Sequence, residues 1–413
     1  MRILWVKAGK LLPVDTGGKI RSYNILRHLA RSHEVTLLSY YGQKRDNVYE
    51  AAIQHELPGT QTICTGTLDG NVFAQSVAYL QRVFQAAPFA VSKFTHPAVR
   101  RAVASLLGTF DVAVCDFLSA SLNFPLALST PTVLFQHNVE TALWRRMAST
   151  EKNPIKKLAY RMEAAKMKRY ERRVLVRFHH VIAVSENDRE QMHAMEPSCT
   201  ITTVPTGVDT GQYPVAPPAN SNPPKIVFTG SMDWEPNLDA VTYFCADIFP
   251  RILVEYPSAL FQIVGRNPHP RVKKLASKNV QVTGTVPSVA EYLREATLVI
   301  VPLRIGGGTR LKIFEAMAMG KAVISTSVGA EGLDVQSGHH LILADDPTAF
   351  ADAILALIRD GSLRQQYEHA AAKLAAQYDW SNIVQLFADA LHLACRDARV
   401  NRNAAEIHAP VKP

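Results

Sequence analysis

The 413-residue sequence predicts an α/β protein built from two doubly wound domains, each with a parallel sheet covered by helices. Short β-branched runs alternate with stretches of helical periodicity, which is typical of parallel sheets. The alternation occurs in two series, separated by a proline-rich segment at residues 213–224. The hydrophobic content of 47% is ample for two cores, and the length suits two or three domains.

The first series begins with a strand at residues 2–6, a glycine-containing loop and a helix over about residues 19–31. The next strand is predicted at residues 33–39. Because Lys7 and Lys10 interrupt the first apolar run, we expect a strand there and not a signal peptide. Further buried strands are expected at residues 111–115, 132–136, 181–184 and 200–204.

The second series supplies the strands of a second sheet. They are expected at residues 225–229, 260–264, 280–283, 298–301, 322–326 and 340–343. The sequence therefore predicts an N-terminal domain at 1–208, a linker at 209–224 and a C-terminal domain at 225–378. The polar end of the chain, residues 397–413, contains two prolines and is expected to be a flexible tail.

Cysteine usage and hydropathy indicate a cytoplasmic protein. The five cysteines are scattered without a Cys-x-x-Cys pair or a Cys/His cluster, which argues against a disulfide framework or a zinc site. The longest apolar run, at residues 297–303, is far shorter than the roughly 20 residues that a membrane span needs. The net charge of +9 suits nucleic acid, an anionic membrane or phosphorylated substrates, and charge alone leaves these three open.

A glycine run after the predicted strand at 298–301 is the first candidate ligand site. It consists of Gly306, Gly307, Gly308 and Thr309. Glycines let the backbone approach a ligand closely with unhindered N–H groups. A helix predicted to start near Arg310 adds partial positive charge, which suits a phosphate.

Charged residues in the first turns of this helix strengthen that hypothesis. Arg310 and Lys312 are cations at a helix N-terminus, where only a bound anion would make them favourable. Glu315 lies deeper and could accept two hydrogen bonds from ribose hydroxyls. The alternative is an ordinary glycine loop with solvated charges and a capping glutamate.

The stretch from Gly308 through Ile324 resembles the donor motif of family 4 glycosyltransferases, which are retaining enzymes of the GT-B fold. In that fold two Rossmann-like domains face a cleft. The family motif is Glu-x7-Glu followed by Ala-x-Ala-x-Gly-x-Pro-Val-Val, and its second glutamate, assigned to the ribose, matches Glu315. The first glutamate, which faces the transferred sugar, falls on Gly307. The stretch is most similar to an exopolysaccharide-associated subgroup with a Gly-Gly-Gly-Thr-Arg-x-Lys motif.

The resemblance extends to the N-terminal half. Gly17 and Gly18 match the family's glycine loop, which approaches the donor phosphate, although a simple strand–helix turn remains the alternative. His137 ends a predicted strand, as the family's active-site histidine does, and a structural histidine is its alternative. Residues 379–396 resemble the helix that crosses back to the N-terminal domain.

The C-terminal half supplies the remaining donor-binding candidates. Family members often place an arginine and a lysine after the first strand of this domain, whereas the loop that begins at Gly230 here contains no cation. Arg310 and Lys312 would therefore have to neutralise the diphosphate. Ser231 could offer a hydroxyl and an N–H group. By resemblance, Arg266 and Val286 lie where the base is read.

The resemblance implies that His137, Arg310 and Lys312 are the catalytic residues of a retaining transfer from a nucleotide-diphosphate sugar to a hydroxyl acceptor, in polysaccharide or glycolipid assembly. No convincing Asp-x-Asp motif accompanies them, so we expect no metal requirement and no cofactor. A non-catalytic nucleotide-sugar-binding protein and a GT-B-fold sugar-nucleotide epimerase remain alternatives. A dinucleotide oxidoreductase is excluded because the Gly-x-Gly-x-x-Gly spacing is missing.

A strongly basic segment at residues 152–177 has apolar residues interleaved at helical spacing. It could hold an anionic membrane surface and so give access to a lipid-linked acceptor. A solvated helical face is the equal alternative. We expect no nucleic-acid partner; the expected partners are the donor and a carbohydrate or lipid-linked acceptor.

Overall fold

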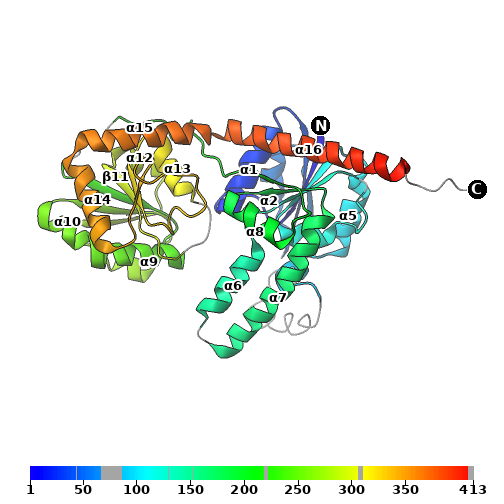
Figure 1. Ribbon diagram of the computed structural model, residues 1–413, viewed down its shortest axis with the longest axis horizontal. Helices are drawn as coiled ribbons and strands as arrows, with labels where there is room; N and C mark the ends of the chain where they lie inside the picture. Colours follow the sequence, from blue (N-terminus) through cyan, green and yellow to red (C-terminus); the bar gives the residue numbers. More distant parts are fainter. Residues whose placement is uncertain are drawn as a thin grey trace, which may run out of the picture. The chain divides into compact units, whose positions relative to one another are not determined.

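The computed structural model describes residues 1–42, 44–66, 86–128, 130–151, 153–217, 222–305 and 310–407. The chain forms two compact units, each built around one parallel sheet (Figure 1). Unit 1 comprises Met1–Pro205 together with the chain from Ile383 onward, and unit 2 comprises Thr206–Asn382. The predicted α/β class with two doubly wound domains is therefore confirmed.

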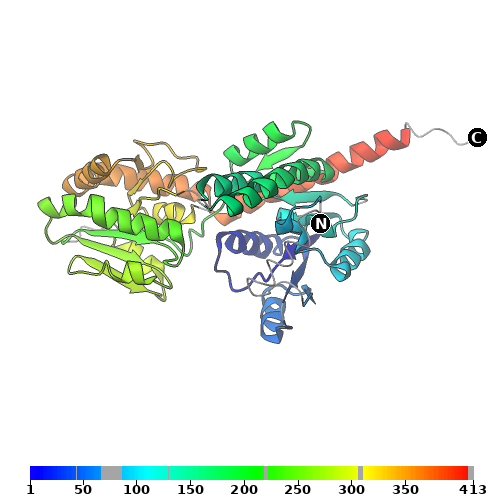
Figure 2. The same cartoon turned by 90° about the horizontal axis from the view of Figure 1, so that it is seen from below.

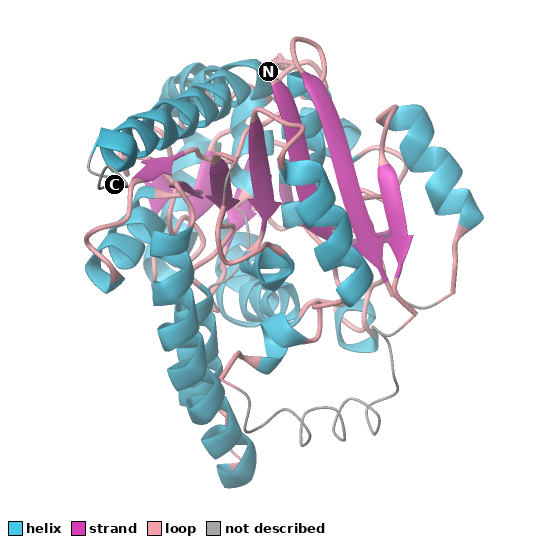
Figure 3. Cartoon of the chain, turned by 90° about the vertical axis from the view of Figure 1, so that its right-hand side faces the viewer, coloured by secondary structure: helices cyan, strands magenta, loops and turns pink. Residues whose placement is uncertain are grey.

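The sheet of unit 1 has seven parallel strands in the order β3-β2-β1-β4-β5-β6-β7, which Figure 3 shows side by side. They are β1 (Arg2–Ala8), β2 (Glu34–Tyr41), β3 (Gln61–Cys64), β4 (Val112–Asp116), β5 (Thr132–Phe135), β6 (His180–Ala183) and β7 (Ile201–Thr203). Strand β4 is buried along its whole length, as a continuous apolar run in a covered parallel sheet should be. The strand order reverses between β1 and β4, and ligands bind beyond the carboxyl ends of strands at such a point.

Helices cover this sheet on both faces. They are α1 (Gly17–Leu29), α2 (Asn47–Glu56), α4 (Phe89–Ser92), α5 (Pro97–Leu107), the 3-10 helix η1 (Leu118–Asn123), α6 (Glu140–Thr150), α7 (Pro154–Arg177), α8 (Glu186–Met195) and α16 (Trp380–Ile407). Local sequence sets where several of them begin. Asn153 accepts hydrogen bonds from the N–H groups of Ile155 and Lys156 at the start of α7, and Ser185 accepts one from Asp188 at the start of α8.

Helices α6 and α7 form a hairpin that extends away from the sheet of unit 1 (Figure 1). Its base is anchored by the buried carboxylate of Glu171, which accepts hydrogen bonds from the N–H groups of Glu140 and Thr141, both at 2.9 Å. A carboxylate at a helix N-terminus is favourable, so Glu171 fixes the start of α6. The ring of Trp144 packs edge-on against Tyr160 further along the pair.

Helix α16 returns to unit 1 after the chain has completed unit 2. The ring of Phe387 on α16 stacks on Trp5 of β1, with centroids 5.4 Å apart, and contacts Phe135 of β5 edge-on. The last helix is therefore part of the core of unit 1. None of the described helices is both long enough and apolar enough to cross a membrane.

The sheet of unit 2 has six parallel strands in the order β10-β9-β8-β11-β12-β13. They are β8 (Lys225–Thr229), β9 (Leu260–Val264), β10 (Val280–Gly284), β11 (Leu298–Val301), β12 (Val323–Ser325) and β13 (Ile342–Leu343). Helices lie on both faces of this sheet (Figures 1 and 2). They are α9 (Glu235–Tyr243), the π-helix η2 (Phe244–Ile248), α10 (Phe249–Glu255), α11 (Pro270–Lys273), α12 (Val289–Glu295), α13 (Leu311–Ala318), α14 (Pro347–Arg359) and α15 (Gly361–Gln377).

Every strand expected from the sequence is present, and the structure adds β3, a short, half-exposed strand that pairs with β2 at the edge of the sheet as far as the residues are described. Helix α16 continues through residues 397–407, the first part of the segment expected as a flexible tail. No glycine or proline occurs between Trp380 and Ile407 to end that helix. The segment expected as a linker packs against unit 2, where the N–H group of Ala216 donates to the carbonyl of Met319.

Candidate functional site

A buried polar cluster lies at the carboxyl ends of the central strands of unit 1. Asp116, the last residue of β4, is its centre. Its Oδ1 atom is 2.8 Å from Nε2 of His137, which follows β5. Its Oδ2 atom accepts hydrogen bonds from Lys7, Ser22 and Trp5, at 2.8, 2.7 and 3.0 Å. Every polar group in this cluster that would lose water is thus paired within the protein.

The hydrogen bonds fix the protonation state of His137. An arginine can only donate, so Nδ1 of His137 accepts from Nη1 of Arg21 at 2.9 Å, and the ring proton on Nε2 points to Asp116. Burial lowers the pKa of His137 to about 3, against the opposing effect of the Asp116 carboxylate. Burial alone would raise the pKa of Asp116, but Lys7 and His137 lower it below its ordinary value. The cluster therefore holds a neutral imidazole and an ionised carboxylate.

The predicted glycine loop at Gly17 and Gly18 is in contact with the Asp116 cluster. Helix α1 begins at Gly17, and no side chain caps its N-terminus and no acid occupies its first turn. A Cβ atom added at Gly18 would lie 2.7 Å from Cζ of Phe117 and 3.7 Å from Nδ1 of His137. Phe117 itself stacks on His137 with ring centroids 3.7 Å apart. Glycine at position 18 thus lets the start of α1 approach the histidine, and its free N–H groups suit an anion.

His137 lies at the strand end that the sequence predicted, but its side chain is only 3% exposed and both ring nitrogens are engaged. In this arrangement it orients Asp116 and Arg21. Sequence reasoning missed Lys7, Arg21 and Asp116 as partners of this histidine. The available signal was a charged residue at the end of an otherwise apolar strand, as in Val112–Asp116.

In unit 2, Lys312 reaches from the first turn of α13 to the loop after β8. Its Nζ atom donates to Oδ1 of Asn237 at 2.9 Å and lies 4.1 Å from the ring centroid of Phe228. A Cβ atom added at Gly230 would be 2.9 Å from the same nitrogen. The loop that contains no cation of its own is therefore in contact with one supplied by α13.

The charge on Lys312 is poised near neutral pH. Burial lowers its pKa to about 7, Glu315 opposes this shift, and the neighbouring Arg310 adds to it. The side chain of Arg310 is buried, and its Nη2 atom lies 3.3 Å from Oε2 of Glu331. Helix α13 begins after Arg310 as predicted, with no capping side chain and no acid in its first turn. A bound anion would offset this concentration of positive charge.

Glu315 lies one turn further along α13. Burial raises the pKa of its carboxyl group, while the hydrogen bond from the Tyr213 hydroxyl and the charge of Lys312 lower it. Tyr213 is a partner that the sequence did not indicate. Because a carboxylate has several acceptor positions, Glu315 can bind one hydroxyl of the protein and retain positions for others.

The carboxyl ends of β8 and β9 pack tightly beside Lys312. A Cβ atom at Gly265 would lie 1.7 Å from the carbonyl oxygen of Gly230, so no larger residue fits there. The next residue, Arg266, donates from Nε to the Ser231 hydroxyl at 2.7 Å, which brings two predicted donor-binding residues together. Val286, after β10, is half-buried and packs against the core of unit 2.

Part of the sequence hypothesis lies beyond the described residues. Gly306, Gly307, Gly308 and Thr309 are outside them, as is Lys152 at the start of the basic segment. In the rest of the chain, no group of three or more His, Cys, Asp or Glu side chains is arranged to hold a metal ion. Independence of metal stays a prediction.

Two family profiles match the chain, one on each unit. Residues 16–212 match Glycosyltransferase Family 4, and residues 223–360 match the group 1 glycosyl transferases. The first match ends just before the proline-rich segment, and the second begins near its end. Together they include Asp116 and His137 of the first cluster and Lys312 and Glu315 of the second.

Curated relatives with similar sequences include named mannosyltransferases. Phosphatidyl-myo-inositol mannosyltransferase of Mycobacterium leprae is 29% identical over 211 residues, which cover 48% of this chain and 55% of that protein. The chain thus spans about half the length of the mannosyltransferases it matches. A protein of the cps region of Klebsiella pneumoniae is 22% identical over 369 residues, covering 86% of this chain and 90% of that one.

Solved structures with the same fold cover almost the whole chain. The Anabaena protein HepE, solved in complex with UDP, superposes with a TM-score of 0.66 at 15% identity over 95% of this chain and all of its own. Sucrose-phosphate synthase of Thermosynechococcus elongatus gives a TM-score of 0.66 at 14% identity, covering 94% and 98% of the two chains. With both profiles matched and this fold shared, the chain belongs to the family 4 glycosyltransferases of the GT-B fold.

Proposed function

We propose that the chain transfers a sugar from a nucleotide-diphosphate donor to a hydroxyl acceptor with retention of anomeric configuration. The observation that carries this proposal is the position of Lys312 Nζ against the Gly230 loop, 2.9 Å from Asn237 Oδ1. Helix α13 thereby supplies a cation where the family's phosphate-binding cations are missing. The carboxylate of Glu315, one turn deeper, is suited to the ribose hydroxyls.

The chemistry requires mainly that the leaving diphosphate be neutralised and the reactants be held in place. Lys312 and Arg310 supply charge at the N-terminus of α13, whose N–H groups add to it. In a front-face reaction the leaving diphosphate takes the proton of the attacking hydroxyl. No carboxylate nucleophile is then needed, and neither His137 nor Asp116 has to exchange a proton with substrate.

The donor and the acceptor are proposed from the relatives. The UDP complex of HepE favours a uridine nucleotide as the first donor to test. The mannosyltransferase names and the cps-region protein favour glycolipid or polysaccharide assembly, in line with the exopolysaccharide-type glycine motif. A lipid-linked acceptor would bring the chain from the cytoplasm to the inner face of a membrane, with residues 152–177 as the contact. We propose that the reaction needs no metal.

Incubation of the purified chain with UDP- and GDP-sugars, with and without a chelator, tests this function. We expect slow donor hydrolysis that the chelator leaves unchanged, and the sugar released to water from an α-linked donor should appear first as the α-anomer by NMR. Lys312→Gln should reduce turnover about a hundredfold or more, the usual effect of losing a main charge stabiliser. Lys274→Gln, a matched change at an exposed lysine of unit 2, should leave turnover unchanged.

The other outcomes identify the alternatives. Donor binding by calorimetry without any hydrolysis or transfer would indicate a non-catalytic nucleotide-sugar-binding protein. A change in the sugar of the recovered nucleotide would indicate an epimerase. An inverted product would contradict the retaining assignment.

A further inference from the structure

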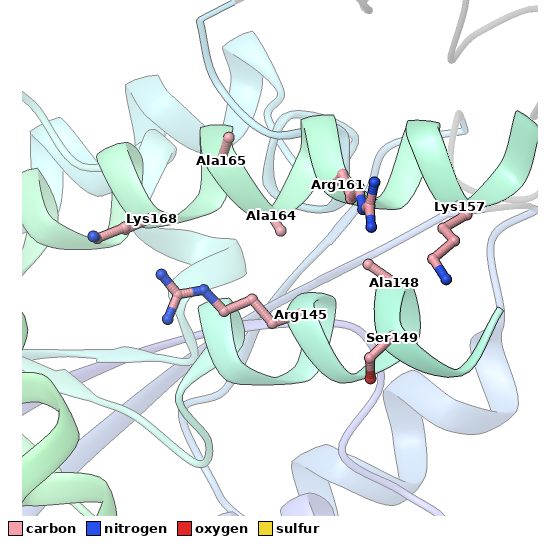
Figure 4. Close-up of a pocket in the computed structure, with 8 residues that line it drawn as sticks. All are labelled: Arg145, Ala148, Ser149, Lys157, Arg161, Ala164, Ala165 and Lys168. Atoms are coloured by element: carbon pink, nitrogen blue, oxygen red, sulfur yellow. The ribbon is translucent and has the colours of Figure 1, made fainter. Parts of the chain in front are cut away.

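A groove of about 590 Å³ lies between α6 and α7 in unit 1. Arg145 of α6 and three cations of α7 line it (Figure 4). The three are Lys157, Arg161 and Lys168. The small side chains of Ala148 and Ala164 also line it, and none of the described lining residues is a carboxylate. Four like charges in one groove repel one another unless an anion lies among them.

Two other cations on the same helix are paired with acids, whereas these four are not. Lys166 lies 3.3 Å from Glu163, and Arg172 lies 2.8 Å from Glu196. The side chains of the four groove cations make no ion pair or hydrogen bond with any residue that the structure describes. The carboxylate of Glu171, at the base of the hairpin, is engaged by N–H groups at the start of α6. The groove therefore gathers four cations that have no counter-charge among the residues described by the structure.

An apolar face beside the groove indicates what carries the anion. Ile155, Leu158 and Met162 are 79%, 61% and 43% exposed and follow one another at helical spacing on α7. A phosphate dissolved in water would need no such face. Exposed apolar residues next to unpaired cations are the pattern of a helix that lies at a membrane interface.

We propose that the α6–α7 groove binds the phosphate of an anionic lipid headgroup, while Ile155, Leu158 and Met162 enter the boundary between headgroups and acyl chains. This assignment specifies the membrane contact proposed above. It rests on the proposed function only in that a lipid-linked acceptor explains why the chain would bind a bilayer. It replaces a diffuse attraction of the whole basic segment by one defined site.

Co-sedimentation of the full chain with vesicles distinguishes a defined lipid site in the groove from a diffuse attraction of the whole basic segment. The chain should bind phosphatidylglycerol-containing vesicles and not pure phosphatidylcholine vesicles. The groove variant Arg145→Gln with Arg161→Gln should lose at least tenfold more affinity than Arg169→Gln with Arg173→Gln, a matched pair of exposed arginines outside the groove. Equal losses would mean that only total charge matters, and failure of the unaltered chain to bind would also overturn the proposal.

The apolar face gives a second test, which distinguishes a lipid from free phosphate. Ile155→Ser with Leu158→Ser should weaken vesicle binding about tenfold or more, because these apolar side chains would no longer be removed from water on binding. Val48→Ser with Val254→Ser, at valines 81% and 86% exposed elsewhere, should not. Unchanged binding by the α7 variant, or full displacement from vesicles by millimolar inorganic phosphate, would overturn the lipid assignment.

These measurements need neither donor nor acceptor. An inactive chain that binds vesicles through the groove would contradict the proposed transferase function and leave this inference intact. If the chain is an active transferase but the groove variant and the control variant lose the same vesicle affinity, this inference is contradicted and the proposed function stands. Circular dichroism of each variant checks that the helices are retained.

Discussion

The Nε2 atom of His137 lies 2.8 Å from Oδ1 of Asp116, and these two residues come from the ends of neighbouring strands. The contact makes the imidazole a buried donor to a carboxylate that also holds Lys7. A histidine with both nitrogens engaged and a ring stacked on Phe117 acts through its neighbours. This relationship leads to the first two predictions.

Asp116→Asn should destabilise unit 1 strongly. The change leaves the buried Lys7 ammonium without its counter-charge, and loss of one partner of a buried pair costs about 3–5 kcal/mol of the free energy of unfolding. Asp111→Asn, in an ion pair whose side chains are 53% and 43% exposed, should cost less than about 1 kcal/mol. Thermal unfolding of both variants is the measurement, and equal effects would contradict the role assigned to Asp116.

The stability of the chain should decrease in mild acid because of His137. The pKa of this histidine is lowered from 6.5 to about 3 in the folded chain, so below pH 6.5 the unfolded chain takes up a proton that the folded chain refuses. The free energy of unfolding should fall by up to about 1.4 kcal/mol per pH unit across that window. His137→Gln should flatten this part of the stability curve measured by urea unfolding. An unchanged slope would show that His137 is protonated in the fold.

Donor affinity should depend on pH through Lys312. Its pKa is about 7 without ligand, and a bound diphosphate must raise it, so binding takes up a proton at higher pH. Affinity for UDP should therefore be greatest below pH 7 and fall by up to about tenfold per pH unit above it. Isothermal titration in two buffers of different ionisation enthalpy measures the proton uptake. No uptake in the alkaline range would separate Lys312 from the diphosphate.

Arg310→Ala should reduce sugar transfer by about a hundredfold or more if its guanidinium stabilises the leaving group. The ion pair with Glu331 supplies a control, since Glu331→Gln removes that pair and keeps the cation. Steady-state rates of both variants show whether Arg310 acts on the leaving group or through its ion pair with Glu331. Similar losses in the two variants would mean that Arg310 serves the structure of unit 2, and near-normal rates for Arg310→Ala would remove it from the phosphate site.

Gly18→Ala should disturb the histidine cluster, because the new Cβ atom would lie 2.7 Å from the Phe117 ring. Overpacking of this kind costs about 1–3 kcal/mol of the free energy of unfolding. Gly108→Ala, where no atom lies within 4 Å of the added carbon, should be neutral or slightly stabilising. Melting temperatures of the two variants provide the comparison. A Gly18→Ala variant as stable as Gly108→Ala would show that Phe117 moves freely.

The sequence by itself determined the α/β class, the two series of strands and the start of α13 after Arg310. These features follow from local periodicity, apolar run length and residues near helix ends, all of which are encoded within a few neighbouring positions. Strand β3 was not predicted, because a short edge strand lacks a continuous apolar run. The full length of α16 was not predicted either, because its last turns are polar and were not recognised as helix.

Only the tertiary structure decided which side chains meet. Lys7, Asp116 and His137 are brought together by the strand order β1-β4-β5, and Lys312 meets Asn237 because α13 and α9 follow strands that lie side by side. The groove between α6 and α7 likewise depends on how two helices pack. Contacts of this kind arise from packing between elements distant in the sequence, and no local pattern of residues encodes them.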